Sequence, residues 1–551
     1  MKLVLAALNA SYPHTNLAIR QIRSRVPEHW ECVLFEKHIN LIRYDMLRDL
    51  IRLQADCVGF SCYLWNRDLC MKLGAALKKA CPETFVYFGG PEAENDPQAF
   101  LACGDAVCRG EGEVSIAPLL KGLEAGDLTR VPGLVTAQFE NPMAAPMQAE
   151  EWPDAYPAGG ESLAGRIVYV ETSRGCPYRC GYCLSAGDKI RALDAQEAVR
   201  RLTALADSGV ELIKLVDRTF NFDRERAADI WEALIDHHAQ KHGGREEEGP
   251  VTTYTQLAKK TEDGLPVTRY HFEIAANLLD ERAFEILKRA PRGLFQFEAG
   301  IQSTNEKTLA AVGRAAGTKE IMANVRRVIA LGNIPVHVDL IAGLPEEDLA
   351  SFGKSFDETY ALGADMLQLG FLKLLPGSRL RREAEQWGIV YDPAPPYEVM
   401  RTPWLRSAEL CLLHDMEKIT DWFDERCPMA MQALSREEGA FAARRRLAED
   451  MRTMGIFDRD HTEKARMAAL VQLRPQLREM VIHELLLQGR PLPGELDTAE
   501  DEILRAHLRA YFHPIRGQRA MRYTCDPRKD GKKQQTILIY DHGRCFEPEN
   551  A

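Results

Sequence analysis

The sequence lacks any long apolar run. No stretch of its 551 residues reaches the roughly 18 consecutive apolar residues from which a membrane-spanning helix is recognised. The apolar run at the N-terminus is interrupted at Asn9 after about six residues, which is too short for a secretory signal peptide. We therefore expect a cytoplasmic protein that does not enter a membrane, and we expect its first segment to be a buried strand.

Two further features are missing, an excess of positive charge and a disulfide pattern. The formal net charge is −11, which gives no attraction to the phosphates of nucleic acid, so we expect no nucleic-acid partner. Most of the fourteen cysteines stand singly in apolar segments, as Cys57, Cys62 and Cys70 do. This arrangement is typical of thiols in a reducing compartment and not of a disulfide framework.

The pattern of apolar residues divides the chain into four regions. Residues 1–140 alternate strand-like and helix-like segments, which predicts an α/β fold with a doubly wound, Rossmann-like parallel sheet. Residues 141–165 are rich in Pro, Ala and Gly and are interpreted as a linker. Residues 166–385 contain six strand–helix units, which predict a partial or complete α/β barrel. Residues 386–551 are predicted to be mostly helical and carry no catalytic motif.

Polar and small residues follow several predicted strands of the first region. Doubly wound sheets bind ligands at the carboxyl ends of their strands. The candidate binding residues there are Asn9 and Ser11 after the first strand, Ser61 and Tyr63 after the third, and Gly89, Gly90, Pro91 and Glu92 after the fourth. The Gly-Gly-Pro sequence can also be no more than a tight turn. A dinucleotide is a rival ligand, but no G-x-G-x-x-G sequence follows any of these strands.

Three cysteines stand close together in "TSRGCPYRCGYCLS", residues 172–185. Cys176, Cys180 and Cys183 have the spacing Cys-x3-Cys-x2-Cys, and no further Cys or His follows until His237. A structural zinc site would need four ligands, usually in two pairs. A [4Fe–4S] cluster bound by three thiolates instead leaves one iron free for another ligand. The missing fourth ligand therefore favours such a cluster over zinc and over a chance grouping of thiols.

In this motif the sequence resembles the radical S-adenosylmethionine (SAM) enzymes, which carry the same three-cysteine spacing in the loop after the first barrel strand. The aromatic Tyr182 before the third cysteine fits the family pattern. Three later elements also look like those of the family: Glu298-Ala-Gly-Ile-Gln302-Ser, Asp339-Leu-Ile-Ala-Gly343-Leu-Pro and Leu374-Leu-Pro376-Gly-Ser. The resemblance implies that SAM chelates the open iron and is cleaved to methionine and a 5′-deoxyadenosyl radical.

The resemblance also implies roles for single residues. Cys176, Cys180 and Cys183 would ligate the iron of the cluster. Glu298 and Gln302 would contact the ribose and methionine ends of SAM, and Gly343 and Pro376 would lie along its adenine and ribose edge. The family's G-G-E element on the second strand is absent, and the sequence from Leu215 to Asn221 stands in its place. Asp217, Arg218 or Asn221 is expected to take over the polar contacts to SAM.

A Rossmann-like domain directly before such a barrel resembles the cobalamin-binding subgroup of the family. The segment from Cys108 to Glu113 matches a strand end of that subgroup. The motif Asp-x-His-x-x-Gly, which supplies a histidine to the lower face of the corrin, is absent around His14. We therefore predict cobalamin without a histidine ligand and interpret His14 as an ordinary loop residue.

The resemblance implies methylation of an unactivated carbon on a small-molecule or peptide substrate, with methylcobalamin as the methyl donor and a flavodoxin or ferredoxin as the reductant. One alternative is a radical rearrangement, cyclisation or oxidation with the same cofactors. A second alternative is an iron–sulfur protein that binds or senses without catalysis. A methylthiotransferase acting on transfer RNA is disfavoured, because the chain is acidic and has neither a second cysteine trio nor a basic C-terminal segment.

Overall fold

The computed structural model describes residues 1–157, 162–242, 267–314, 317–488, 490, 492–494, 496, 518–523, 536–541 and 544–546. The chain folds into two compact units. The first unit contains residues 1–301, 306–337 and 371–403, and the second contains residues 302–305, 338–370 and 404–551. In the described part of the chain, no helix is both long enough and apolar enough to cross a lipid bilayer.

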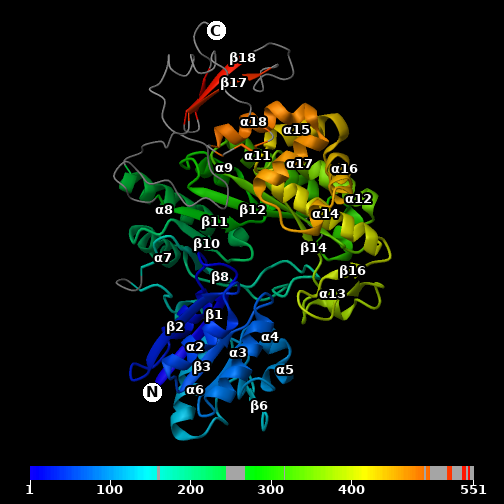
Figure 1. Cartoon of the computed structure of the whole chain (residues 1–551). Coiled ribbons are helices and arrows are strands. Elements are labelled where there is room, and N and C mark those ends of the chain that lie inside the picture. The colour runs from blue at the N-terminus through cyan, green and yellow to red at the C-terminus, as the bar shows by residue number, and fades with distance from the viewer. Residues whose placement is uncertain are drawn as a thin grey trace. The chain divides into compact units, whose positions relative to one another are not determined.

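A six-stranded sheet forms the N-terminal part of the first unit (Figure 1). Its strands lie in the order β2-β1-β3-β4-β5-β6, and all neighbours are parallel except β5 and β6. The strands are β1 (Lys2–Asn9), β2 (Glu31–His38), β3 (Cys57–Ser61), β4 (Phe85–Gly89), β5 (Ala106–Cys108) and β6 (Leu134–Thr136). The predicted doubly wound sheet is therefore confirmed.

Helices cover both faces of this sheet. They are α1 (Leu17–Arg23), α2 (Arg43–Leu53), α3 (Arg67–Ala80), α4 (Pro91–Asn95), α5 (Pro97–Leu101) and α6 (Gly112–Ala125). Side chains of α2, α3 and α5 pack on the face that carries Val4 and Ala6, and side chains of α1 and α6 pack on the face that carries Leu3 and Leu5. Because both faces are buried, the strands read as continuous apolar runs.

The second six-stranded sheet has the order β14-β13-β12-β11-β10-β7, and the pairs from β7 to β12 are parallel. Its strands are β7 (Ile167–Val170), β10 (Leu212–Leu215), β11 (Arg269–Glu273), β12 (Phe295–Gln302), β13 (Val336–Ala342) and β14 (Met366–Phe371). The helices between them are α7 (Ala195–Asp207), α8 (Arg224–His242), α9 (Glu281–Leu287), α10 (Glu306–Ala311), α11 (Thr318–Leu331) and α12 (Leu349–Tyr360). The predicted partial barrel of six strand–helix units is confirmed.

Aromatic packing holds the helices to one face of this sheet. The buried Trp231 of α8 contacts Phe272 of β11, with 6.2 Å between ring centroids, and Phe297 of β12, with 5.5 Å. Phe220, which follows β10, joins the same cluster at 4.4 Å from Phe272. Phe272 and Phe297 therefore point toward the helices, and the residues that alternate with them on the strands point to the opposite face.

The described part of the second unit beyond residue 404 is mostly helical, as predicted for residues 386–551. Its helices are α14 (Ser407–Phe423), α15 (Pro428–Glu438), α16 (Ala440–Thr453), α17 (Glu463–Leu473) and α18 (Arg478–Leu487). A small antiparallel sheet of β17 (Gln518–Tyr523), β18 (Thr536–Asp541) and β19 (Arg544–Phe546) follows them.

The first unit also contains two short antiparallel strand pairs: β8 (Ser173–Arg174) with β9 (Arg191–Ala192), and β15 (Val390–Tyr391) with β16 (Val399–Arg401). The helix α13 (Arg379–Arg382) precedes β15 and belongs to the first unit.

The predicted linker, which lies within the first unit, packs against other segments of that unit along part of its length. Met147 and Trp152 are buried. The backbone N–H of Met147 donates to the carboxylate of Glu111 at 2.7 Å, and Arg201 donates to the carbonyl of Trp152 at 2.8 Å. The segment therefore has fixed contacts with the elements that it connects.

Candidate functional site

The loop that carries the three cysteines leaves the short strand β8 through Gly175. This glycine has a φ of 95°, and a Cβ atom there would lie 2.7 Å from the carbonyl oxygen of Lys189. Only glycine fits both requirements. Cys176 and Cys180 are buried, Cys183 is half-buried, and all three are free thiols. The turn at Gly175 thus brings the thiols of one short loop into a protected position.

Gly181 is bonded to two other segments at the centre of the loop. Its N–H donates to the carbonyl of Val312 at 2.7 Å, and its own carbonyl accepts from the N–H of Leu380 at 2.8 Å. Val312 follows α10, and Leu380 lies in α13. The loop between Cys180 and Cys183 is therefore held by segments that follow it by more than a hundred residues.

A buried carboxylate fixes the entry to this loop. Asp217, which follows β10, accepts hydrogen bonds from the N–H of Thr172 at 2.7 Å, from the Thr172 hydroxyl at 2.5 Å and from the Ser173 hydroxyl at 2.8 Å. Arg226 of α8 donates to the Thr172 hydroxyl at 2.8 Å. Burial raises the pKa of Asp217, while these hydrogen bonds and the Arg226 charge oppose the rise. Asp217 thus positions Thr172 and Ser173 directly before the cysteines.

Each cysteine has a polar neighbour, from the segment after β10 or from the segment after α10. The Sγ of Cys176 lies 3.4 Å from Oγ1 of Thr219, and the Sγ of Cys180 lies 3.9 Å from Nη1 of Arg314. Burial raises the pKa of Cys183, and the Arg218 charge acts against that rise. Three free thiols on one loop, beside a hydroxyl and two guanidinium groups, form a donor set that fits a thiolate-bound iron–sulfur cluster.

The face of the second sheet away from the helices is polar. Backbone register places Tyr169 of β7, Lys214 of β10, His271 of β11 and Gln296 of β12 side by side. Strand alternation puts Glu298 on the same face as Gln296. Burial lowers the pKa of Lys214, and the nearby carboxylates of Glu298 and Glu273 oppose that shift. A parallel sheet that is polar on one face encloses a site and not only a core.

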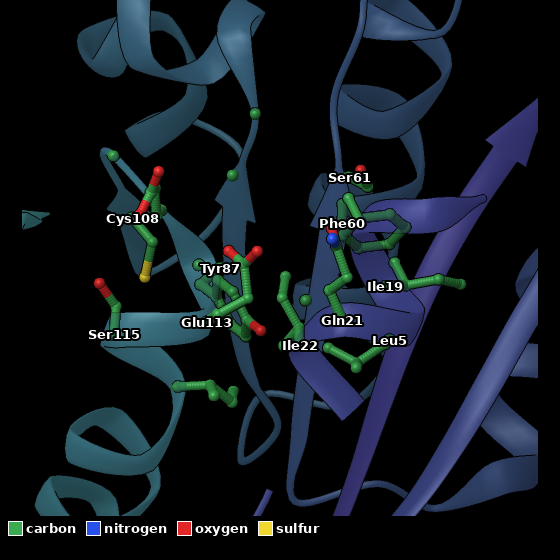
Figure 2. A pocket seen from close by; sticks show the side chains of 18 of the residues that line it. Leu5, Ile19, Gln21, Ile22, Phe60, Ser61, Tyr87, Cys108, Glu113 and Ser115 are labelled. Atoms are coloured by element: carbon green, nitrogen blue, oxygen red, sulfur yellow. The ribbon is translucent and has the colours of Figure 1, made fainter. Parts of the chain in front are cut away.

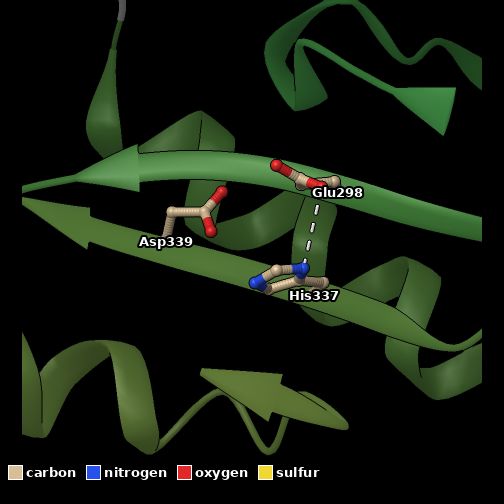
Figure 3. A group of neighbouring side chains, drawn as sticks. All are labelled: Glu298, His337 and Asp339. Atoms are coloured by element: carbon tan, nitrogen blue, oxygen red, sulfur yellow. Dashed lines mark ion pairs between the residues drawn. The ribbon is translucent and has the colours of Figure 1, made fainter. Parts of the chain in front are cut away.

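Glu298, a predicted SAM contact, lies between two imidazoles. Its Oε2 atom is 3.2 Å from Nε2 of His271. The same atom is 3.7 Å from Nδ1 of His337, the ion pair that Figure 3 shows. Both histidines are buried, whereas the Glu298 side chain is 27% exposed. Burial lowers the pKa of His271 to about 4, so this histidine is neutral at pH 7. The Glu298 side chain therefore stays partly exposed while His271 and His337 fix the orientation of its carboxylate.

Gln302 and Gly343 belong to the second unit, where two loops are joined. Both residues have positive φ angles, of 70° and 90°. Ser303, next to Gln302, donates to the buried carboxyl group of Glu347 at 2.6 Å. Burial raises the pKa of Glu347 to about 7, and the hydroxyls of Ser303 and Ser355 partly offset this. This contact ties the loop after β12 to the loop after β13, which contains Gly343.

Asn221 and Pro376 are two further residues predicted to contact SAM. The side chain of Asn221 is buried and makes reciprocal hydrogen bonds with the backbone of Ala275, at 2.9 and 2.8 Å. Pro376 is half-buried and precedes Gly377, which has a φ of 90°. Contacts of Asn221, Asp217 or Pro376 with SAM stay predictions, and the two polar side chains already have protein partners.

A cavity of about 210 Å³ lies at the carboxyl ends of the N-terminal strands (Figure 2). Four of the predicted binding residues line it: Ser61, Tyr63, Gly89 and Gly90. Its other polar lining comes from Gln21, Glu111, Glu113, Ser115, Glu171 and Arg174. The strand ends of the first sheet thus enclose the ligand space expected for a doubly wound fold.

The other predicted residues of this sheet do not line the cavity. The buried Asn9 donates to the carbonyl of His14 at 2.8 Å. The buried Glu92 accepts from the Tyr397 hydroxyl at 2.7 Å and from Arg67 at 3.3 Å. Ser11 is half-buried, and Pro91 is an exposed residue at the start of α4. Contacts of these residues with a cofactor stay predictions, and the structure shows Asn9 and Glu92 bonded within the protein.

Arg174 joins the cavity to the cysteine loop. Its guanidinium donates to Glu111 at 2.9 Å, to Glu113 at 2.5 Å and to Glu171 at 2.5 Å, and it lies 4.7 Å from the ring centroid of Trp152. Three carboxylates around this half-buried cation more than offset the cost of its partial burial, so its pKa is raised. Arg174 lines the cavity and precedes Cys176 by two residues.

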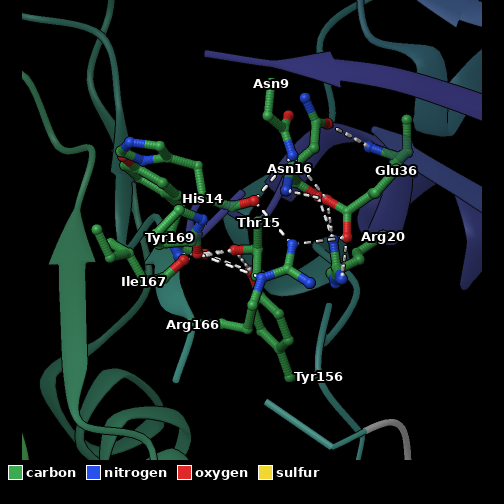
Figure 4. Close-up of polar contacts among 12 residues, drawn as sticks. Asn9, His14, Thr15, Asn16, Arg20, Glu36, Tyr156, Arg166, Ile167 and Tyr169 are labelled. Carbon is green, nitrogen blue, oxygen red and sulfur yellow. Dashed lines mark hydrogen bonds and ion pairs between the residues drawn. The ribbon is translucent and has the colours of Figure 1, made fainter. Parts of the chain in front are cut away.

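A second contact connects the first sheet to the barrel strand β7. The N–H of Thr15 donates to the carbonyl of Ile167 at 3.1 Å, and the N–H of Ile167 donates to the carbonyl of Pro13 at 2.7 Å. The Nδ1 atom of His14 lies 2.6 Å from the hydroxyl of Tyr169 (Figure 4). Burial and the charges of Lys214 and Arg166 lower the pKa of His14. His14 is therefore an interface residue, a role that the sequence did not indicate.

Comparison with known proteins identifies both halves of this site. Residues 3–120 match the B12 binding domain, and residues 170–358 match the radical SAM superfamily. The chain is a B12-binding radical SAM protein. These two domains imply a [4Fe–4S] cluster, SAM and cobalamin as its cofactors. Residues 385–487 of this B12-binding radical SAM protein match a domain of unknown function, DUF4080.

Several curated proteins and solved structures are similar to it, among them two methyltransferases and one radical enzyme. The chain is 27% identical over 320 residues to a 2-(S-pantetheinyl)-carbapenam-3-carboxylate methyltransferase from Streptantibioticus cattleyicolor, covering 54% of this chain and 44% of the relative. It is 26% identical over 369 residues to the cobalamin-dependent radical SAM methyltransferase TokK from Streptomyces tokunonensis, covering 62% and 51%. The solved structure of the radical enzyme OxsB with aqua-cobalamin and SAM covers 91% of this chain and 76% of that chain, with 15% identity and a TM-score of 0.58.

The likeness to OxsB concerns the fold alone. The chain of the B12-binding radical SAM protein spans about half the length of the two curated relatives named above. Sequence reasoning missed Arg174, Arg314, Lys214 and His271. The signal for Lys214 and His271 was present, because a lysine interrupts "LIKL" and polar residues alternate with apolar ones in "RYHFE", where a parallel strand is expected to be apolar throughout.

Proposed function

We propose that the chain is a cobalamin-dependent methyltransferase that uses SAM to methylate an unactivated carbon of a small-molecule or peptide substrate. The observation that carries this proposal is Arg174, which lines the cavity of the B12-binding domain and lies two residues before the first cysteine of the loop. When bound, the cluster supplies the electron that cleaves SAM, and cobalamin carries the methyl group. A flavodoxin or ferredoxin is the proposed reductant.

The residues of the N-terminal sheet would bind cobalamin through backbone and aromatic surface. Gly89 and Gly90 line the cavity without a side chain, so a large flat ligand can approach the backbone closely. Tyr63 stacks on the exposed Trp65 with 4.7 Å between centroids and 2° between planes, which extends this surface. The cavity of about 210 Å³ is smaller than a whole corrin, so it would hold one of the side chains at the edge of the corrin ring.

The residues of the barrel would bind the cluster and SAM. Cys176, Cys180 and Cys183 would hold three irons, and Gly175 and Asp217 fix the loop before ligands arrive. A loop fixed in advance lowers the cost of ordering it on binding. Glu298 would orient SAM, and His271 would hold the Glu298 carboxylate in position.

The function is tested by product analysis with SAM that carries a deuterated methyl group. Anaerobically reconstituted protein, given a low-potential reductant and candidate substrates, should give a product three mass units heavier than the unlabelled methylated product, together with 5′-deoxyadenosine. A label-free product formed together with 5′-deoxyadenosine would contradict methylation and leave a rearrangement, cyclisation or oxidation. Fully loaded protein that forms no 5′-deoxyadenosine with any candidate would contradict a radical reaction.

The cobalamin site gives a separate prediction about Gly89. A Cβ atom at this position would have only the carbonyl oxygen of Cys108 nearby, at 3.6 Å, so a larger side chain can enter the cavity without a backbone clash. Gly89→Leu should therefore weaken retention of hydroxocobalamin by about tenfold or more, because its side chain fills the space that the ligand needs. Corrin absorbance after desalting measures this.

Gly89→Ala is the matched control, since it adds only the tolerated Cβ atom, and it should retain cobalamin as the wild type does. Unchanged retention by a folded Gly89→Leu protein would show that cobalamin does not use this cavity.

A further inference from the structure

Arg314 is a half-buried cation beside the cysteine loop. It lies beyond α10, one residue after Gly313, and its Nη1 atom is 3.9 Å from the Sγ of Cys180. Its Nη2 atom donates to the backbone carbonyl of Gly300 on β12. The phenol of Tyr182 is a third neighbour. Within the described residues, no carboxylate forms an ion pair with Arg314.

A half-buried guanidinium whose neighbours are a carbonyl, a phenol and a thiol has little to offset its charge. Burying a cation without an anion is costly, because the charge loses its hydration. The thiolate that Cys180 forms when it binds iron would supply a negative charge beside the Arg314 guanidinium. This arrangement stabilises negative charge on the thiolate side of the site, where the other cysteines stand beside Thr219 and Arg218.

The charge matters most when the cluster accepts an electron. An oxidised cluster with three thiolates carries one net negative charge, and the reduced cluster carries two. A fixed positive charge nearby stabilises the reduced form more than the oxidised form, and the effect is strong where water is excluded. Hydrogen bonds to the sulfur ligands act in the same direction.

We propose that Arg314 is a positioning residue that raises the reduction potential of the cluster by holding a half-buried positive charge beside Cys180 while it binds the Gly300 carbonyl of β12. This inference rests on the proposed function, because it assumes that the three cysteines hold a [4Fe–4S] cluster. In the step concerned, one electron passes from an external one-electron donor to the cluster, and no bond is made or broken in the protein. Arg314 thereby links the cysteine loop to the strand that carries Glu298.

The test is a potentiometric titration of the reconstituted full-length protein, followed by the electron paramagnetic resonance signal of the reduced cluster. SAM is left out, because its carboxylate would itself neutralise a nearby guanidinium. Arg314→Met removes the charge at similar length, and we expect the equilibrium constant for reduction to fall at least tenfold, about 59 mV for one electron. Arg314→Lys keeps a positive charge on a shorter side chain, so its reduction potential should lie between those of the wild type and of Arg314→Met.

Arg326→Met is the matched control, because Arg326 is exposed on α11. The cluster of this variant should have the reduction potential of the wild type. If Arg314→Met loads no iron, Arg314→Gln decides in its place, since its amide can still donate to Gly300 but carries no charge. A neutral variant with full iron content and the wild-type potential overturns the inference. Wild-type protein that binds no iron overturns the proposed function instead, and iron analysis separates these two failures.

Discussion

Replacing Cys176, Cys180 and Cys183 together by alanine should reduce bound iron to background and lower the formation of 5′-deoxyadenosine from SAM by at least about a thousandfold. Iron–sulfur clusters are held by cysteine thiolates, and the three thiols of this loop are the ones placed beside Thr219 and Arg314. Alanine removes every sulfur ligand without adding bulk. Iron and sulfide analysis, together with chromatography of the SAM products, measures both losses.

Cys411→Ala is the control, because Cys411 is an exposed free thiol on α14, and it should bind iron and cleave SAM as the wild type does. The triple variant should still retain cobalamin, since the cavity of the B12-binding domain contains none of the three cysteines. A triple variant that keeps a full complement of iron would place the cluster on other cysteines of the chain.

Asp217→Ala should lower the free energy of unfolding of the apo-protein by about 3 kcal/mol. The substitution leaves the Thr172 N–H and two hydroxyls without their acceptor, and it leaves the buried Arg226 without the carboxylate charge that stabilises it. A buried group that loses its partner costs more than an exposed one, because no water replaces the partner. Urea denaturation of the apo-protein under anaerobic conditions measures the loss.

Iron loading of Asp217→Ala should fall as well, since Thr172 and Ser173 lead directly into the cysteine loop. Asp236→Ala is the matched control, because Asp236 is exposed on α8, and its effect should stay within about 0.5 kcal/mol. Unfolding of Asp217→Ala within about 1 kcal/mol of the wild type would show that the carboxylate does not fix the loop.

The fold was predictable because its strands are buried on both faces or end in recognisable turns. The runs from Leu3 to Leu8 and from Cys57 to Phe60 contain no polar side chain, and such runs have few alternatives in a chain of alternating strands and helices. The cysteine loop was predictable because its ligands are neighbours in the sequence. Their spacing and the missing fourth ligand then favour an iron–sulfur cluster over a zinc site.

The rest of the site could not be read in the same way. Arg314 and Arg174 are two of many arginines, and only the folded chain brings Arg314 to Cys180 and three carboxylates to Arg174. Asn9 and Glu92 stand at strand ends, where ligands bind in such folds. Their side chains instead bond to His14, Tyr397 and Arg67, partners that no local pattern indicates.

The hydrogen bonds of Gly181 have a consequence for the order of assembly during synthesis. The N–H of Gly181 is bound by Val312 and its carbonyl by Leu380. Chains are made from the N-terminus at about 5–20 residues per second, so the cysteines leave the ribosome some ten seconds or more before Leu380 is made. Until then the loop lacks one of its two anchors. We therefore expect cluster insertion to follow completion of the barrel, so that truncated or stalled chains carry the thiols without the site.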